Sequence, residues 1–260
     1  MIMIKKFKHS GTMGDIVYGL AVMKQLGGGE FYLHLGQVEW IAQHYYGTEP
    51  DSYHKGKMSE KEFEFMRDFM EAQEYITHFG MLDVTNTEIT HNLDRFRPIF
   101  VGHPTNYINI YCTVFGITDP DEQTKVSDGP WLSVPQPRPI PGKPYVVNRS
   151  PRGFTAPGVN PTWNSWREQG IDTESVFVGL PNEYDAFKQL TGWNIDYYPT
   201  KTMLELAEVI AGCDQFIGNQ SVALSIAQGL RVPYAFEARA DLPIERNESY
   251  FPNHENGDNF

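Results

Sequence analysis

The sequence predicts an α/β protein with two parallel-sheet domains that face a central cleft. Short apolar strands alternate with helical patterns in both halves of the chain, which is typical of parallel sheets. A proline-rich stretch interrupts this alternation near the middle. The length of 260 residues suits two domains of about 100–150 residues each.

The first half opens with a strand–helix–strand unit. Residues 1–7 are apolar and basic and predict a strand, and a turn with two glycines follows over residues 9–15. The next residues predict a helix, because apolar side chains recur on one face at Ile16, Leu20 and Met23. Three glycines end that helix, and residues 30–35 predict the second strand.

Three further elements are expected before the middle of the chain. Residues 58–74 predict an exposed amphipathic helix with a charged outer face. Residues 98–102 predict a short strand, and residues 108–115 predict a helix.

Six prolines between residues 129 and 144 mark the domain boundary. Proline fixes φ and lacks a backbone N–H, so neither a helix nor a central strand can run through this stretch. An extended, semi-rigid connector is expected instead. We therefore divide the chain into an N-terminal domain (1–138), a C-terminal domain (139–240) and a tail (241–260).

The second half repeats the alternation. The expected strands are residues 145–148, 174–179, 215–218 and 232–236. The expected helices are residues 163–169, a segment through Lys188, residues 203–211 and residues 222–228, the last ended by Gly229. Thr202 and Glu205 have the spacing of a capping box, in which each side chain binds the other's free backbone donor.

The charge and composition exclude several classes of protein. With 21 basic and 33 acidic side chains the net charge is −12, which argues against general nucleic-acid binding, since phosphate contacts need clustered Lys and Arg. No apolar run is long enough to span a membrane. Cys112 and Cys213 lack metal-ligand spacing and are expected to be reduced thiols. We expect a soluble, cytoplasmic protein.

The loops that follow strands are the candidate sites, because ligands of parallel α/β domains bind beyond the carboxyl ends of the strands. The first such loop and helix start contain Ser10, Gly11, Thr12, Met13, Gly14 and Asp15. The glycines allow a tight turn and close approach of a substrate, and helix-start amides favour negative charge. Asp15 either stabilises the helix dipole or faces the cleft as a general base.

The second domain supplies the other candidates. The turn after its third strand contains Gly218, Asn219, Gln220 and Ser221. Its amides and the Ser221 hydroxyl are suited to a phosphate, unless Ser221 only caps its helix.

Charged residues add to this second set. Arg149 and Arg152 follow the first strand of the domain and are either phosphate ligands or ordinary surface arginines. Glu183 is suited to ribose hydroxyls or to a helix start, and His103 to substrate contact or to a structural role. No histidine pair has metal-ligand spacing, so no metal site is predicted, and nucleotide-binding or hydrolase motifs are absent from the sequence.

Taken together, three segments resemble the ADP-heptose:lipopolysaccharide heptosyltransferases, glycosyltransferase family 9. They are SGTMGDIVYGL (10–20), VFVGLPNE (176–183) and residues 202–236, with a helix, a strand, a Gly-Asn turn and a helix of small residues. The resemblance implies the GT-B fold, in which two Rossmann-like domains face a central cleft. It also implies inverting transfer of a sugar from a nucleotide-diphosphate donor to a glycan or other hydroxyl acceptor, without a metal or other cofactor.

The resemblance assigns roles to three residues. It implies Asp15 as the catalytic base, Ser221 in the donor-phosphate turn and Glu183 at a donor-side acidic position. The phosphate turn departs from the family, because Gln220 stands where the family has Asp and Ser225 where it has His. Heptose is therefore not implied as the sugar, and Arg149 or Arg152 would replace the family's lysine.

Two other functions stay open at the level of sequence. A nucleotide-sugar-binding protein without transferase activity fits the altered phosphate turn. A nucleotide-sugar epimerase of the same fold would release a changed donor without any acceptor. A modified DNA base as acceptor is a special case of the transferase, against which the net charge of −12 argues.

Overall fold

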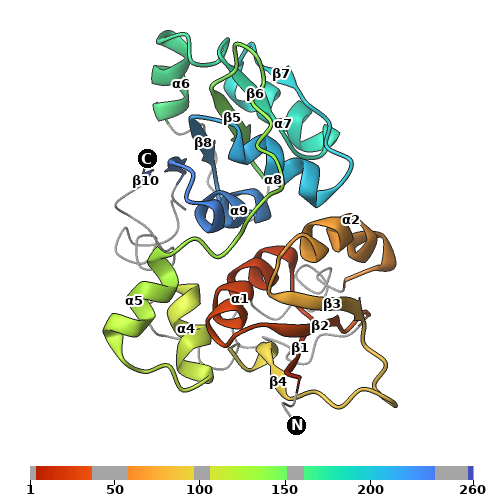
Figure 1. The fold of residues 1–260 in the computed structure, drawn as a ribbon. Helices are drawn as coiled ribbons and strands as arrows, with labels where there is room; N and C mark the ends of the chain where they lie inside the picture. The colour runs from red at the N-terminus through yellow and green to blue at the C-terminus, as the bar shows by residue number, and fades with distance from the viewer. Residues whose placement is uncertain (1–3, 37–57, 97–105, 151–160, 238–256, 260) are drawn as a thin grey trace, which may run out of the picture.

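The computed structural model of the chain describes residues 4–36, 58–96, 106–150, 161–237 and 257–259. In these ranges the chain forms two separate parallel sheets with helices packed against them (Figure 1). The predicted α/β class with two parallel-sheet domains is confirmed.

The first sheet has β1 in its interior, paired in parallel with β2 and β4. In spatial order its strands are β3 (Ile76–Met81), β2 (Gly29–Leu33), β1 (Lys6–His9) and β4 (His91–Asn92). The helical elements of this half are α1 (Met13–Gln25), α2 (Glu60–Glu71), the short 3-10 helix η2 (Leu93–Phe96), α4 (Tyr107–Val114) and α5 (Pro120–Asp128).

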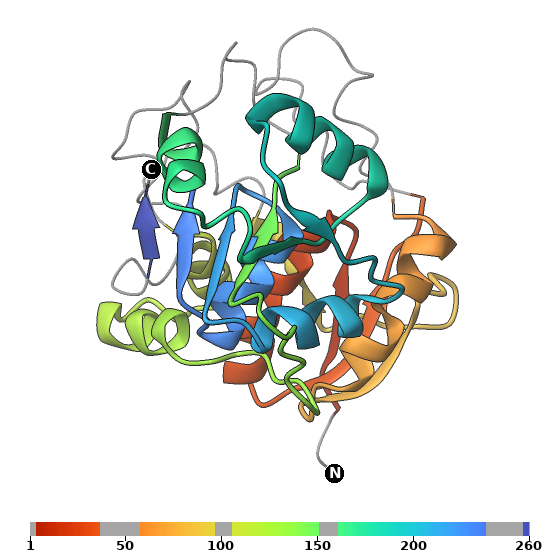
Figure 2. The ribbon, with the colours of Figure 1, turned by 90° about the horizontal axis from the view of Figure 1, so that it is seen from above.

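The second sheet is built in the same way around β5, which pairs in parallel with β6 and β8. In spatial order its strands are β10 (Gly257–Asn259), β9 (Tyr234–Phe236), β8 (Gln215–Gly218), β5 (Tyr145–Asn148), β6 (Ser175–Phe177) and β7 (Asp196–Tyr197), with β10 at the edge beside β9 (Figure 2). Its helices are α6 (Pro161–Glu168), α7 (Pro181–Thr191), α8 (Met203–Ala211) and α9 (Val222–Leu230).

The two domains are joined through their helices. α1 packs against α9, and α2 packs against α8, so these four helices lie between the sheets (Figure 1). All residues from Ile16 to Met23 in α1 and from Ala223 to Gly229 in α9 are buried. A helix with neighbours on opposite sides needs small or apolar residues all round. One apolar cluster therefore extends through both domains.

The connector over residues 129–144 contains no helix and only one isolated bridge, from Ile140 to Lys143. It is nevertheless fixed to both domains. The indole N–H of buried Trp131 donates to the carbonyl of Val17 in α1 (3.1 Å), and its backbone N–H donates to the carbonyl of Gly229 in α9 (3.1 Å). The expected semi-rigid spacer is therefore a packed part of the domain interface.

Two predictions, about the end of α9 and the start of α8, need correction. α9 does not end at Gly229 but continues to Leu230, and Arg231 ends it with a left-handed backbone (φ 62°). The Thr202 hydroxyl accepts from the amide of Glu205 as predicted (3.2 Å), but the Glu205 carboxylate binds the amide of Lys201 instead of that of Thr202 (2.8 Å).

The helix predicted over residues 58–74 is α2, and it is less exposed than expected. Phe63, Met66 and Phe69 are buried beneath the charged face, because α2 lies between β3 and α8. The first strand begins at Lys6 rather than at residue 1. The strand predicted over 98–102 lies outside the described residues.

Candidate functional site

The predicted loops follow the central strands of the two sheets. Strand order reverses beside β1 in the first sheet and beside β5 in the second. Ligands of parallel sheets bind beyond the carboxyl ends of the strands at such reversals. Asp15 follows β1, Arg149 follows β5 and Ser221 follows β8, so all three lie at these ends.

The first turns of α1 and α9 touch each other. A Cβ atom added to Gly14 would lie 3.9 Å from Cα of Val222 and 4.0 Å from Oγ of Ser225. Asp15 directly follows Gly14, and Ser221 directly precedes Val222. Asp15 and Ser221 are therefore close to the same junction between the two domains, and both are partly exposed.

The electrostatics of this junction favour an anion. Both helices begin here, and the amides of a helix's first turn carry partial positive charge. Thr12 precedes α1 without a side-chain capping bond. Ser221 caps α9, and its hydroxyl accepts from the amide of Leu224 over a long 3.4 Å. The junction thus combines amide donors with the carboxylate of Asp15.

The turn after β8 is held by contacts on several sides. The Asn219 side chain is buried, accepts from the amide of Ser150 (3.0 Å) and donates to its carbonyl (2.6 Å). A Cβ atom at Gly218 would clash with the carbonyl of Asn148, so only glycine fits there. The Gln220 amide donates to the hydroxyl of Tyr107 in α4 (3.2 Å), which ties this turn to the N-terminal domain.

Arg149 already has a carboxylate partner. Its Nε lies 2.6 Å from Oε2 of Glu237, and its Nη2 lies 3.3 Å from Oε1, a bidentate pair that is largely buried. A diphosphate bound by Arg149 would have to share the guanidinium with Glu237. Arg152 and His103, the other two predicted contacts, lie outside the described residues.

Glu183 stabilises the start of α7. Its carboxylate accepts from the amide of Leu180 (2.9 Å), so the helix-start alternative is realised. Burial raises the pKa of Glu183, while hydrogen bonds from the Leu180 amide and the Ser150 side chain oppose that rise. The contact with Ser150 brings Glu183 to the loop after β5.

Three polar residues near this junction are not predicted from the sequence. Tyr107 binds Gln220, Asp94 accepts from Ser10, and Tyr111 donates to the carbonyl of Asp15. Each is a single polar residue without a motif, and its partner lies far away in the chain. His9 begins the predicted loop, but its bond to Tyr111 is not predicted either. Only the packing of the elements shows these contacts.

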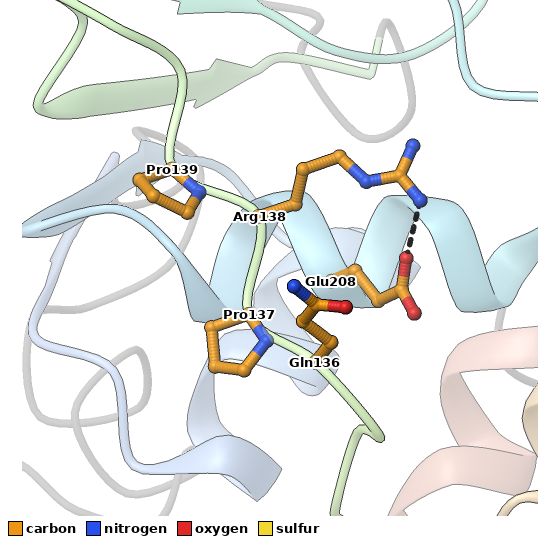
Figure 3. Close-up of a pocket in the computed structure, with 5 residues that line it drawn as sticks. All are labelled: Gln136, Pro137, Arg138, Pro139 and Glu208. Atoms are coloured by element: carbon orange, nitrogen blue, oxygen red, sulfur yellow. Dashed lines mark hydrogen bonds and ion pairs between the residues drawn. The ribbon is translucent and has the colours of Figure 1, made fainter.

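Three other observations bear on the site. Within the described ranges, no group of three or more His, Cys, Asp or Glu residues is placed to hold a metal ion. In the same ranges, no helix is long and apolar enough to cross a membrane. A pocket is lined by residues 136–139 of the connector and by Glu208 of α8, and Arg138 pairs with Glu208 there (2.6 Å) (Figure 3). Arg138 also pairs with Glu205 (3.0 Å).

Two parallel-sheet domains with helix starts meeting between them are the architecture of the GT-B fold. No protein-family model and no curated protein sequence matches the chain. Solved structures do match it. A family 9 glycosyltransferase from Veillonella parvula DSM 2008 has a TM-score of 0.58 at 10% identity, over 98% of this chain and 85% of that chain.

Two further solved structures also match this chain. ADP-heptose lipopolysaccharide heptosyltransferase II of E. coli has a TM-score of 0.53 at 11% identity, over 99% of this chain and 90% of that chain. The iron-containing dodecameric glycosyltransferase TibC from enterotoxigenic E. coli H10407 has a TM-score of 0.54 at 15% identity, over 96% of this chain and 62% of TibC. The resemblance to family 9 is confirmed at the level of the fold.

Proposed function

We propose that this protein is an inverting, metal-independent glycosyltransferase that uses a nucleotide-diphosphate sugar. The observation that carries the proposal is the contact between the first turns of α1 and α9, with Asp15 on one and Ser221 beside the other. The contact brings Asp15 close to the amides that begin α9, and helix-start amides favour anions. The fold is shared with glycosyltransferases.

In the proposed reaction the donor diphosphate binds the Ser221 hydroxyl and the amides that begin α9, with help from Arg149 or Arg152. Asp15 removes the proton of the acceptor hydroxyl, and the acceptor oxygen attacks the anomeric carbon from the side opposite the diphosphate. As the sugar–phosphate bond breaks, its electron pair stays on the diphosphate, where the amides stabilise the charge. The configuration at the anomeric carbon inverts.

The first experiment is the substitution Asp15→Asn. We expect turnover to fall by about 10²–10⁴, with donor affinity retained, because the amide cannot accept the proton. Asp121→Asn is the matched control, since Asp121 is a first-turn carboxylate of α5 on the surface. Full turnover in Asp15→Asn would remove Asp15 from the mechanism.

A screen of ADP-, UDP-, GDP- and CMP-sugars by thermal shift identifies the donor, since a ligand that binds only the folded protein raises its melting temperature. Product analysis then separates the classes of function. Transfer to a glycan or other hydroxyl compound supports the proposal. Binding without conversion supports a nucleotide-sugar-binding protein, and a changed donor without acceptor supports an epimerase.

Metal independence is tested separately, because TibC is described as iron-containing. We expect transfer by the purified protein to be unchanged after treatment with EDTA. Loss of transfer that added iron or magnesium restores would contradict this part of the proposal.

A further inference from the structure

A buried hydrogen-bond chain lies behind the first turn of α1. His9, the last residue of β1, and Tyr111 of α4 are both fully buried. The amide of Gly11 donates to Nδ1 of His9 (2.8 Å), and Nε2 of His9 lies 2.7 Å from the Tyr111 hydroxyl. The Tyr111 hydroxyl donates to the backbone carbonyl of Asp15 (2.9 Å).

The donors and acceptors of this chain fit in one direction. A carbonyl only accepts, so the Tyr111 hydrogen points to Asp15 and the hydroxyl oxygen accepts from Nε2–H of His9. Nδ1 accepts from Gly11, and Oδ1 of Asp94 lies 3.4 Å from the same nitrogen. With the Gly11 amide as its donor Nδ1 carries no proton, so both ends of the chain put the ring proton of His9 on Nε2.

The loop before α1 is held by a second buried group. Oδ1 of Asp94, which is 4% exposed, accepts from the amide of Ser10 (3.1 Å). The amide of Ser10 is thus bound by Asp94 of η2, and the amide of Gly11 by His9 of β1. Tyr111 of α4 binds the first turn of α1. The backbone that carries Asp15 is fixed from three elements at once.

We propose that His9 and Tyr111 are positioning residues for Asp15. They hold the β1–α1 loop and the first turn of α1, so that the Asp15 carboxylate stays at the junction with α9. This inference rests on the proposed function, in which that carboxylate is the general base. A displacement of about 1 Å at a reacting group can lower a rate by roughly 10²-fold.

The kinetic test uses Tyr111→Phe, which deletes the hydroxyl and keeps the ring that stacks on Phe96 (4.5 Å between centroids). We expect kcat to fall by roughly 10- to 100-fold, with KM for the donor changed by less than about twofold, because the donor-binding turn belongs to α9. Tyr75→Phe is the matched control. It deletes another phenol-to-carbonyl hydrogen bond, from Tyr75, the residue before β3, to the carbonyl of Trp131 (2.8 Å).

The decisive comparison repeats Tyr111→Phe in the Asp15→Asn background. If Tyr111 acts through the Asp15 carboxylate, its substitution should not lower kcat further once that carboxylate has been removed. The falls in kcat of the two single variants should therefore not add in the double variant. Equal losses in both backgrounds would overturn the proposal. Unchanged kcat in the single variant, or a fall as large in Tyr75→Phe, would overturn it too.

Substitutions of His9 give an independent test if Tyr111→Phe folds poorly. Gln presents an amide donor where Nε2 lies, whereas Leu offers neither donor nor acceptor. We expect His9→Gln to keep clearly more of the wild-type kcat than His9→Leu. Equal losses would contradict a role for the bond to Tyr111.

Nuclear magnetic resonance tests the network without any substrate. In the ¹⁵N-histidine spectrum, the His9 ring, identified by its loss in His9→Gln, should show a protonated Nε2 and a bare Nδ1. The ¹³C resonance of the Asp15 carboxyl should shift in Tyr111→Phe and stay in place in Tyr75→Phe. The opposite tautomer of His9, or an Asp15 carboxyl resonance that does not shift in Tyr111→Phe, refutes the positioning network. Absence of sugar transfer by the wild-type protein refutes only the proposed function.

Discussion

Burial controls the chemistry of the two cysteines. Cys112 in α4 is fully buried, and Cys213 lies between α8 and β8 with its Sγ donating to the carbonyl of Ile210 (3.1 Å). Both are free thiols, as expected from the sequence. Burial raises the pKa of each thiol to about 12.

The raised pKa predicts slow modification of the folded protein. Only the thiolate reacts, and at pH 8 a pKa of about 12 leaves about 10⁻⁴ of the thiol ionised, against roughly a quarter in an unfolded chain. In Cys213→Ser, which isolates Cys112, we expect a thiol reagent to react at least 10-fold faster after addition of urea than before it. Equal rates in both conditions would contradict the burial of Cys112.

At the residue scale, the sequence predicts in which loop a candidate site residue lies better than it predicts which residue it binds. The loops with Asp15 and Ser221 follow strands, and a loop after a parallel strand is visible in a sequence. The pairs Arg149–Glu237 and Tyr107–Gln220 join residues 88 and 113 positions apart. Such pairs depend on how whole elements pack, which spacing along the chain does not encode.

Among the elements, α2 has the most complete start. Ser59 accepts from the amide of Glu62, and the Glu62 carboxylate accepts from the amide of Ser59 (2.8 Å), which forms a full capping box. The box lies on the surface, so its contribution can be measured without disturbing the core.

We expect Ser59→Ala to lower the free energy of unfolding by about 1 kcal/mol, because the first turn of α2 loses its side-chain acceptor. Ser59→Asp is the matched control, since it restores an acceptor and adds a favourable charge at a helix start. Urea unfolding followed by circular dichroism measures both. Equal destabilisation by the two variants would show that the cap contributes little.

The sequence predicts the helices and strands that have a clear apolar pattern, and it does not predict the very short or mostly polar ones. β5, α8 and β8 have the predicted bounds, because each has an apolar run between turn residues. β4 and β7 contain two residues each, too few to show alternation. α5 was missed because its sequence is mostly polar, although Asp119 and Pro120 are a typical helix start.

At the scale of the whole molecule, the two domains are held together by the α1–α9 and α2–α8 contacts and by the connector. Gly229 in α9 illustrates how closely they pack, because a Cβ atom there would lie 2.5 Å from Cδ1 of Leu132 and 2.9 Å from Nε1 of Trp131. Since one apolar cluster spans both domains, we expect the two domains to unfold together.

Gly229→Ala tests this coupling. The added methyl group forces the connector away from α9, and we expect the free energy of unfolding to fall by about 1–3 kcal/mol in a single calorimetric transition. Gly19→Ala is the control, because its Cβ would lie 3.4 Å from the nearest side-chain atom and would favour the helix. Two transitions, with only one of them shifted, would show that the domains unfold independently.

The anchoring of Trp131 to both α1 and α9 limits how such a protein can be re-engineered or diversify. Replacing the C-terminal domain with a foreign one would break the apolar surface that α9 shares with α1, unless the connector and the matching helix face were exchanged with it. If the proposed function holds, we therefore expect donor preference to change more readily through substitutions in the loops that follow the strands than through exchange of whole domains.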